Sequence, residues 1–174
     1  MKKFEFQKGM IQVCYALIPC TAVSIFLFGW RSLALLAVAI IVGGGTEALF
    51  TLRAGKPVTS AVLVSSMIFA LSLPPAVPLW MCAVGIAVGI GIGKMAFGGF
   101  GRNVFNPAMV GRCFLYISFP LHMTNRWAEP FRGGPAGLLA WAPAADGMTG
   151  ATPLEIIRAG GESPLSGLIL GSTG

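Results

Sequence analysis

Five stretches of apolar residues, separated by short polar connectors, fill most of the first 120 positions of the chain. They cover roughly residues 10–29, 32–50, 58–73, 77–97 and 107–120. The first two runs are each about 20 residues long, which is enough for a helix to cross a hydrocarbon core of ~30 Å. The pattern predicts an all-α integral membrane protein with about five transmembrane or re-entrant helices.

The third run is short, contains several serines, and ends at Pro74 and Pro75. It fits either a tightly matched span or a broken, re-entrant helix, and the sequence leaves both open. A re-entrant third run would make the number of crossings even and move the later residues to the other side of the membrane. The fourth run is glycine-rich, which favours close helix packing in lipid, through Gly85, Gly89, Gly91 and Gly93.

The basic residues predict the orientation of the chain. With a cytoplasmic N-terminus and five crossings, eight basic residues lie inside or at the inner boundary: Lys2, Lys3, Lys8, Arg53, Lys56, Lys94, Arg102 and Arg112. Four lie outside: Arg31, Arg126, Arg132 and Arg158. This bias follows the positive-inside rule. We therefore expect a cytoplasmic segment at residues 1–9, a membrane domain at 10–120 and an extracytoplasmic segment at 121–174.

The composition agrees with a membrane protein, since 55% of the residues are hydrophobic and 10% are charged. The net charge of +6 is explained by the orientation and not by nucleic acid, because no basic stripe or patch is present. The first run is too long for a signal peptide and no cleavage site follows it. The four cysteines are irregularly spaced within apolar runs, which indicates buried free thiols and no metal site.

Glu47 and Arg112 are the charged residues expected at membrane depth, where an ionisable group costs at least ~2.5 kcal/mol. Two interpretations of Glu47 stay open. Its carboxylate reaches water by snorkelling from the inner end of the second span, or it forms a cation or proton coupling site beside Thr46. Arg112 is expected to pair with Glu47 or with the polar edge of a cofactor.

Residues 98–108 join the fourth and fifth runs with the sequence Gly-Gly-Phe-Gly-Arg-Asn-Val-Phe-Asn-Pro-Ala. The glycines permit a tight reversal, and Asn106 is placed to cap a helix that opens at Pro107. The free amides of that helix start would attract an anion or a polar ring edge. The segment is therefore either a well-capped turn or a binding site like those at the half-helices of transporters.

Residues 146–152 (Asp-Gly-Met-Thr-Gly-Ala-Thr) form a small polar stretch in an otherwise apolar protein. Such clusters are commonly turns or helix caps. Here the stretch ends on Thr152, whose hydroxyl can carry a covalent group. The small residues Gly147, Gly150 and Ala151 leave room for a bulky cofactor close to the backbone.

Four segments, taken in order, carry a resemblance to a known family: residues 43–48, 72–75, 98–112 and 146–154. Over nearly its whole length the chain resembles the membrane family that comprises the B subunit of the sodium-pumping NADH:quinone oxidoreductase and the D subunit of the Rnf complex. The resemblance implies that FMN is attached through a phosphoester to Thr152. It also implies that a flavin transferase recognises Asp146, Thr149, Gly150 and Ala151, with Thr149 standing where serine is common.

The resemblance further implies a membrane subunit of a redox-driven, ion-translocating electron transport complex in the bacterial inner membrane. Its partners would be other subunits of that complex, membrane lipid and, in the sodium-pumping branch, a quinone. The segment with Arg102, Asn103 and Asn106 is similar to a family signature near bound flavin. Whether riboflavin or a second FMN binds there stays open, as does the choice between the two branches and between Na⁺ and H⁺.

The family usually has about twice as many spans, arranged as an inverted repeat. The chain is therefore expected to be an N-terminal half that is inactive alone. A different class of function also stays open, because Asn106-Pro107-Ala108 resembles the signature of a passive channel of the urea-channel or aquaporin type. Such channels normally repeat the signature, and this chain has one copy. A non-catalytic assembly subunit is the third alternative.

Overall fold

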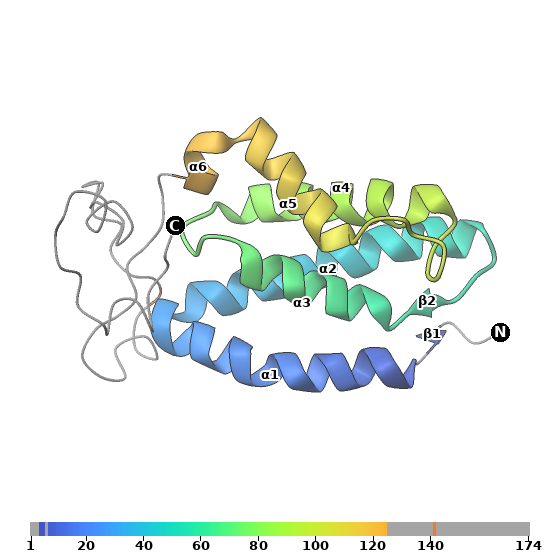
Figure 1. The fold of residues 1–174 in the computed structure, drawn as a ribbon, viewed down its shortest axis with the longest axis horizontal. Helices are drawn as coiled ribbons and strands as arrows, with labels where there is room; N and C mark the ends of the chain where they lie inside the picture. Colours follow the sequence, from blue (N-terminus) through green and yellow to red (C-terminus); the bar gives the residue numbers. More distant parts are fainter. Residues whose placement is uncertain (1–3, 6, 125–140, 142–174) are drawn as a thin grey trace, which may run out of the picture.

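The computed structural model describes residues 4–5, 7–124 and 141, and this part of the chain is mostly helical (Figure 1). The helices are α1 (Lys8–Phe28), α2 (Trp30–Arg53), α3 (Ala61–Ser72), α4 (Leu79–Gly93), α5 (Pro107–Ser118) and α6 (Pro120–Thr124), with a 3-10 turn η1 at Met95–Phe97. Two short strands, β1 (Phe4–Glu5) and β2 (Val58–Thr59), pair in parallel. The expected all-α membrane architecture is confirmed.

Three of the helical segments are long and apolar enough to cross a membrane. They are α1 with 21 residues, α2 with 24, and the 19 residues of α4 continued by η1. Both α3 and α5 have 12 residues, which corresponds to a helix of ~18 Å. Each therefore reaches only part of the way through a hydrocarbon core.

The five main helices run alternately in opposite directions along the bundle (Figure 1). One end, here called the β end, holds β1, β2 and the turn between α4 and α5. Gln7 donates its backbone N–H to Ser60 Oγ there, so α1 and α3 begin side by side. The other end, here called the far end, holds Gly29 between α1 and α2, residues 73–78 between α3 and α4, and α6.

The third apolar run passes from the β end to the far end, although α3 itself is short. Residues 73–78 continue it as irregular backbone, and Leu73, Pro74, Pro75 and Val77 are buried. Arg31 Nη2 donates to the carbonyl oxygens of Ala76 and Val77 at 3.3 Å each. Non-helical backbone is tolerated at membrane depth where protein buries it in this way. Helices α5 and α6 then lead the chain back to the far end, so the described chain makes an odd number of passages along the bundle and Thr124 lies at the far end.

Helix α3 lies at the centre of the bundle and buries most of its surface against α1, α2 and α5. Its Phe69 packs with Ile86 of α4 and Leu115 of α5 in the main core. By contrast, α1 has no buried residue and lies at the edge of the bundle. The outer face of α1 is therefore apolar surface suited to lipid or to protein not present in this structure.

Helices α4 and α5 pack backbone against backbone, through glycines. A methyl group at Gly89 would collide with the carbonyl oxygen of Pro107, and one at Gly111 would lie 2.5 Å from the carbonyl oxygen of Gly85. Gly93 also contacts the start of α5. The prediction of close packing is confirmed for these positions and wrong for Gly91, which faces open space.

Candidate functional site

Glu47 lies on the face of α2 that points into the bundle. The buried residues of this helix are spaced by four, at Leu35, Ala39, Gly43, Glu47 and Thr51. Side chains at that spacing share one face of a helix. The position therefore directs the Glu47 carboxylate to the core, and the side chain is fully buried.

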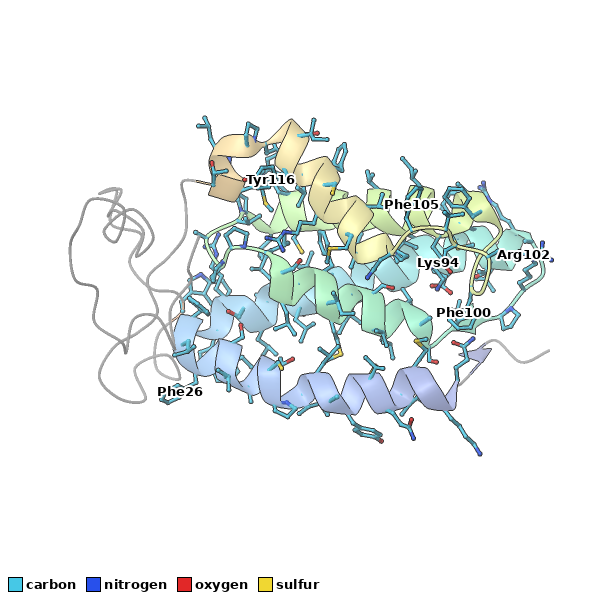
Figure 2. All side chains as sticks on the ribbon, viewed as in Figure 1. Phe26, Lys94, Phe100, Arg102, Phe105 and Tyr116 are labelled. Carbon is cyan, nitrogen blue, oxygen red and sulfur yellow. The ribbon has the colours of Figure 1, made fainter. Side chains whose placement is uncertain are left out.

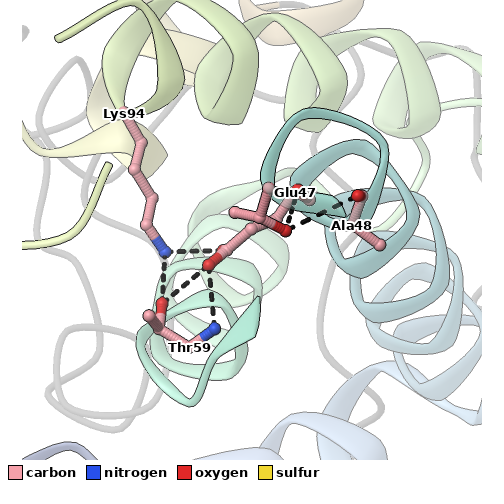
Figure 3. Close-up of polar contacts among 5 residues, drawn as sticks. Glu47, Ala48, Thr59 and Lys94 are labelled. Carbon is pink, nitrogen blue, oxygen red and sulfur yellow. Dashed lines mark hydrogen bonds and ion pairs between the residues drawn. The ribbon is translucent and has the colours of Figure 1, made fainter. Parts of the chain in front are cut away.

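The Glu47 carboxylate forms a closed polar cluster with Lys94 and Thr59 (Figure 3). Lys94 Nζ lies 2.6 Å from Glu47 Oε2 and donates to Thr59 Oγ1 at 2.8 Å. Thr59 donates to Glu47 Oε1 twice, from its hydroxyl at 2.7 Å and from its backbone N–H at 3.0 Å. Both carboxylate oxygens are thus hydrogen-bonded, and the negative charge faces a positive one.

The cluster ties together three segments that are distant in sequence. Glu47 lies in α2, Thr59 lies in β2, and Lys94 directly follows the last residue of α4. The side chains of Lys94 and Glu47 are 2% and 1% exposed. Losing one member of such a pair is costly because it leaves an uncompensated charge in a low-dielectric interior.

Of the alternatives left open for these charges the structure excludes two, and one prediction is wrong. Glu47 does not snorkel to water, because it is buried and fully hydrogen-bonded. Its partner is Lys94 and not Arg112, which lies partly exposed on α5. The sequence pattern predicts Lys94 as a charge at the membrane boundary, whereas it lies in the core. Ile86, Ile90 and Lys94 are spaced by four residues and are all buried, as residues on one face of a helix are. The run is apolar on every face, so the sequence alone does not mark that face.

The turn that follows Lys94 reverses the chain between α4 and α5. Gly98, Gly99 and Gly101 have φ angles of 100°, 98° and 82°, a region that residues with a Cβ rarely adopt. The backbone N–H of Gly99 donates to the carbonyl oxygen of Lys94 at 3.1 Å. The glycines thus let the chain fold back tightly over the buried cluster.

The end of this turn confirms the predicted helix cap. Asn106 Oδ1 accepts from the backbone N–H of Ala108 at 3.0 Å, and Pro107 begins α5. Asn103 Nδ2 donates to the carbonyl oxygen of Phe105 at 3.3 Å. Arg102 is exposed, and so are the rings of Phe100 and Phe105, on the same turn (Figure 2). Arg102, Asn103 and Asn106 are therefore brought together, on the turn that Lys94 begins.

The predicted flavin attachment residues Asp146, Thr149, Gly150, Ala151 and Thr152 lie outside the described residues. Trp141, which precedes Thr152 by 11 positions, is described. Its carbonyl oxygen accepts from the backbone N–H of Arg31 at 2.8 Å. Trp141 therefore lies at the far end, away from the turn that carries Arg102.

The two ends of the bundle differ in the side chains that they expose. Exposed basic residues of the described chain lie at the β end, at Lys8, Arg53, Lys56 and Arg102. The far end exposes tryptophans, at Trp30, Trp80 and Trp141, and Trp80 packs edge-on against Phe119. Tryptophan is typical of the interfaces of a membrane, and excess basic residues are typical of its cytoplasmic side.

The cysteines are free, as expected, but they are mostly not in the core. Cys82 is buried, Cys14 is half-buried, and Cys20 and Cys113 are exposed. No cluster of His, Cys, Asp and Glu suited to a metal occurs in the described part of the chain. The polar chemistry of the described core is therefore centred on Glu47, Lys94 and Thr59.

These features define a multi-pass helical membrane protein with a buried ion pair and a glycine-rich turn at one end. Comparison of the sequence with protein families gives the more specific assignment. The model of the NQR2, RnfD, RnfE family matches residues 1–174. The chain belongs to this family, and the resemblance drawn from the sequence segments is confirmed.

Curated relatives come from two kinds of complex. The chain is 40% identical over 168 residues to the D subunit of an ion-translocating oxidoreductase complex from Stutzerimonas stutzeri, across 88% of this chain and 47% of the relative. It is 42% identical over 127 residues to the B subunit of a Na(+)-translocating NADH-quinone reductase from Pseudomonas paraeruginosa, across 73% of this chain and 28% of the relative. The chain thus spans about half the length of the first relative, and less of the second.

Proposed function

We propose that this chain is part of the membrane subunit of a redox-driven, ion-translocating electron transport complex, and that Thr152 carries FMN through a phosphoester bond. The observation that carries the proposal is the family match over residues 1–174, together with the Asp146–Thr152 motif in a chain of that family. Both relatives are named as subunits of such complexes, so other subunits of a complex of this kind are the expected partners.

The arrangement of the helices supports an extracytoplasmic position for Thr152. The exposed basic residues gather at the β end, which favours a cytoplasmic location for that end and for the N-terminus. The chain leaves the described bundle at the far end after an odd number of passages, and Trp141 lies at the same end. FMN on Thr152 would then be on the side opposite the N-terminus, in the bacterial inner membrane.

The attachment needs a separate enzyme. A threonine hydroxyl is a weak nucleophile, so Thr152 Oγ1 gains its bond to phosphorus only with a base and an activated flavin nucleotide. The hydroxyl proton leaves as the phosphoester forms, and the phosphoanhydride bond of the donor, a flavin dinucleotide, breaks to release a nucleoside monophosphate. The enzyme expected to catalyse this transfer is a flavin transferase. When bound, FMN supplies the electron-carrying chemistry, and the chain positions the ring.

The turn with Arg102, Asn103 and Asn106 is our proposed site for a second, noncovalent flavin, riboflavin or FMN. Asn106 uses Oδ1 for the helix cap, which leaves its amide nitrogen for the edge of a ring. Phe100 and Phe105 have exposed rings on the same turn as Arg102, and the ring of Phe105 packs edge-on against Phe97. The two flavins would then lie at opposite ends of the bundle.

Glu47 is our proposed ion-coupling residue. A carboxylate that is buried beside a lysine in a membrane protein is costly to maintain, and such residues commonly mark ion pathways. Glu47→Gln should impair ion-coupled electron transport in the assembled complex without loss of covalent flavin. Unchanged coupling in that variant would remove Glu47 from the pathway.

The flavin proposal is tested by fluorescence of the protein band after denaturing electrophoresis. The chain is expressed with its flavin transferase, and a covalent flavin keeps its fluorescence in SDS. We expect a fluorescent band for the wild type and for Thr124→Val, which removes a hydroxyl at the far end outside the motif. Thr152→Val should be dark. A dark wild-type band would favour the passive channel or the assembly subunit.

A further inference from the structure

Lys94 places an ammonium group where two oxygen-bearing side chains converge inside the protein. Its Nζ lies 2.6 Å from Glu47 Oε2 and 2.8 Å from Thr59 Oγ1 (Figure 3). Carboxylate and hydroxyl oxygens are also ligands for hard cations. An ammonium group and an alkali cation carry the same charge, so one can replace the other without changing the net charge of the buried cluster.

We propose that Glu47 and Thr59 form a binding site for a small monovalent cation, and that Lys94 is a tethered cation that fills this site in the present conformation. The inference rests on the proposed ion coupling at Glu47 and deepens it by naming the competing occupant. A cation enters only when the Lys94 side chain withdraws, and Lys94 returns when the cation leaves. The carboxylate then keeps a counter-charge in both states.

The need for a counter-charge follows from the burial of Glu47. The carboxylate has both oxygens hydrogen-bonded but no access to water in this structure. A vacant site would hold an unpaired buried charge, which is strongly disfavoured. Exchange of Lys94 for a cation avoids that state.

The location of Lys94 in the fold makes its withdrawal feasible. Lys94 directly follows the last residue of α4, and its backbone N–H still donates to the carbonyl oxygen of Ile90 at 3.2 Å, so it lies at the junction of the helix and the turn. The turn that follows has three glycines with positive φ and is held to the connector before β2 through a 3.5 Å hydrogen bond from Lys56 Nζ to Gly98 O. A shift of this turn would move Lys94 relative to Glu47.

The same turn carries Arg102, Asn103 and Asn106. A ligand that binds these residues more tightly in one position of the turn would shift the balance between the two occupants. The site also lies near the β end, because Glu47 is six residues, or ~9 Å along the axis, from the end of α2 at Arg53. A cation from the β end would therefore need to cross only a short distance.

The proposal is tested by removing the tethered ammonium and supplying free cations. The full chain is placed in lipid nanodiscs, and its thermal unfolding midpoint is measured at constant ionic strength in choline chloride and in LiCl, NaCl or KCl. In Lys94→Ala the midpoint should be lower in choline and rise saturably with at least one alkali cation. The rise should be about 3–6 °C when the cation is at tenfold its Kd.

Matched controls separate the site from general salt effects. The wild type should not respond, because Lys94 fills the site. Lys94→Ala combined with Glu47→Gln should not respond either, because the charge that attracts the cation is gone. A similar rise in that double variant would overturn the proposal, and so would the absence of any response in Lys94→Ala.

A second variant covers the case in which Lys94→Ala does not fold. Lys94→Gln keeps a hydrogen-bond donor for Glu47 and Thr59 but lacks the charge, and it should show the same selective response. If both variants stay unfolded in every cation while the double variant folds, the proposal is contradicted, since a fitting cation would restore the charge balance. The measurement involves neither flavin nor transport, so it is independent of the flavin test at Thr152 and the coupling test at Glu47→Gln.

Discussion

Lys94 and Glu47 are 47 positions apart in sequence, yet Lys94 Nζ lies 2.6 Å from Glu47 Oε2 in the interior of the bundle. The ion pair joins the end of α4 to α2, and Thr59 joins β2 to both. It therefore fixes how the connector after α2 and the turn after α4 lie against each other. The predicted flavin-binding residues Arg102, Asn103 and Asn106 are on that turn.

Removing one charge of this pair should cost more stability than removing both. Lys94→Met leaves the Glu47 carboxylate buried without a partner, and we expect a loss of about 3–5 kcal/mol in the free energy of unfolding. Lys94→Met combined with Glu47→Leu should be much closer to the wild type. A double-mutant cycle by thermal or denaturant unfolding in nanodiscs measures the difference. Equal losses in the single and double variants would contradict the ion pair.

The glycine contact between α4 and α5 predicts different effects for the same substitution at Gly89 and at Gly91, two positions on one helix. Gly89→Ala should push α5 away, because the new methyl group meets the backbone of Pro107, and we expect a loss of about 1–3 kcal/mol. Gly91→Ala faces open space and should be neutral or slightly stabilising, since alanine favours a helix. Unfolding midpoints of the two variants give the comparison. Similar values would argue against the close packing.

Asn106 has two separable roles, a helix cap and a proposed flavin contact. Asn106→Asp keeps the capping oxygen, so α5 should be as stable as in the wild type, whereas Asn106→Ala should lose about 1 kcal/mol. Both variants lose the amide nitrogen and should retain less noncovalent flavin after purification. Flavin released by mild denaturation is measured by fluorescence per mole of protein. Full retention of flavin in Asn106→Asp would contradict the flavin contact and show that Asn106 acts only as a helix cap.

The orientation predicts opposite labelling for the two ends of the bundle. In a variant without Cys14, Cys20, Cys82 and Cys113, a cysteine placed at Ala54 lies at the β end and one at Ala151 lies in the flavin motif. Intact cells treated with a membrane-impermeant maleimide should label Ala151→Cys but not Ala54→Cys. Lysis should expose both. Labelling of both positions from the same side would show that the number of crossings is even.

Much of the fold could be predicted from the sequence because lipid imposes strong rules on apolar length and backbone hydrogen bonding. The five helical segments, the cap at Asn106 and the packing glycines on α4 all follow from local pattern. The course of the third run does not, since the buried turn at residues 73–78 is held by Arg31 from a distant part of the chain.

Of the buried cluster of Glu47, Thr59 and Lys94, only Glu47 could be predicted from the sequence, for a related reason. Glu47 stands out as a charge within an apolar run, but Lys94 directly follows one and looks like an ordinary boundary lysine. Pairing the two requires knowing that α2 and α4 are neighbours, which hydrophobic pattern alone does not give. Thr59 lies in β2, between α2 and α3, and nothing in the sequence around it indicates that its side chain binds Glu47 and Lys94.

Attachment of FMN to Thr152, the centre of the proposed function, is tested most directly by mass spectrometry of the tryptic peptide that covers residues 133–158, between Arg132 and Arg158. The chain is coexpressed with its flavin transferase. We predict a peptide heavier by one FMN less one water, with fragment ions that place the added mass on Thr152 and not on Thr149. An unmodified peptide, or an adduct on Thr149, would contradict the proposal.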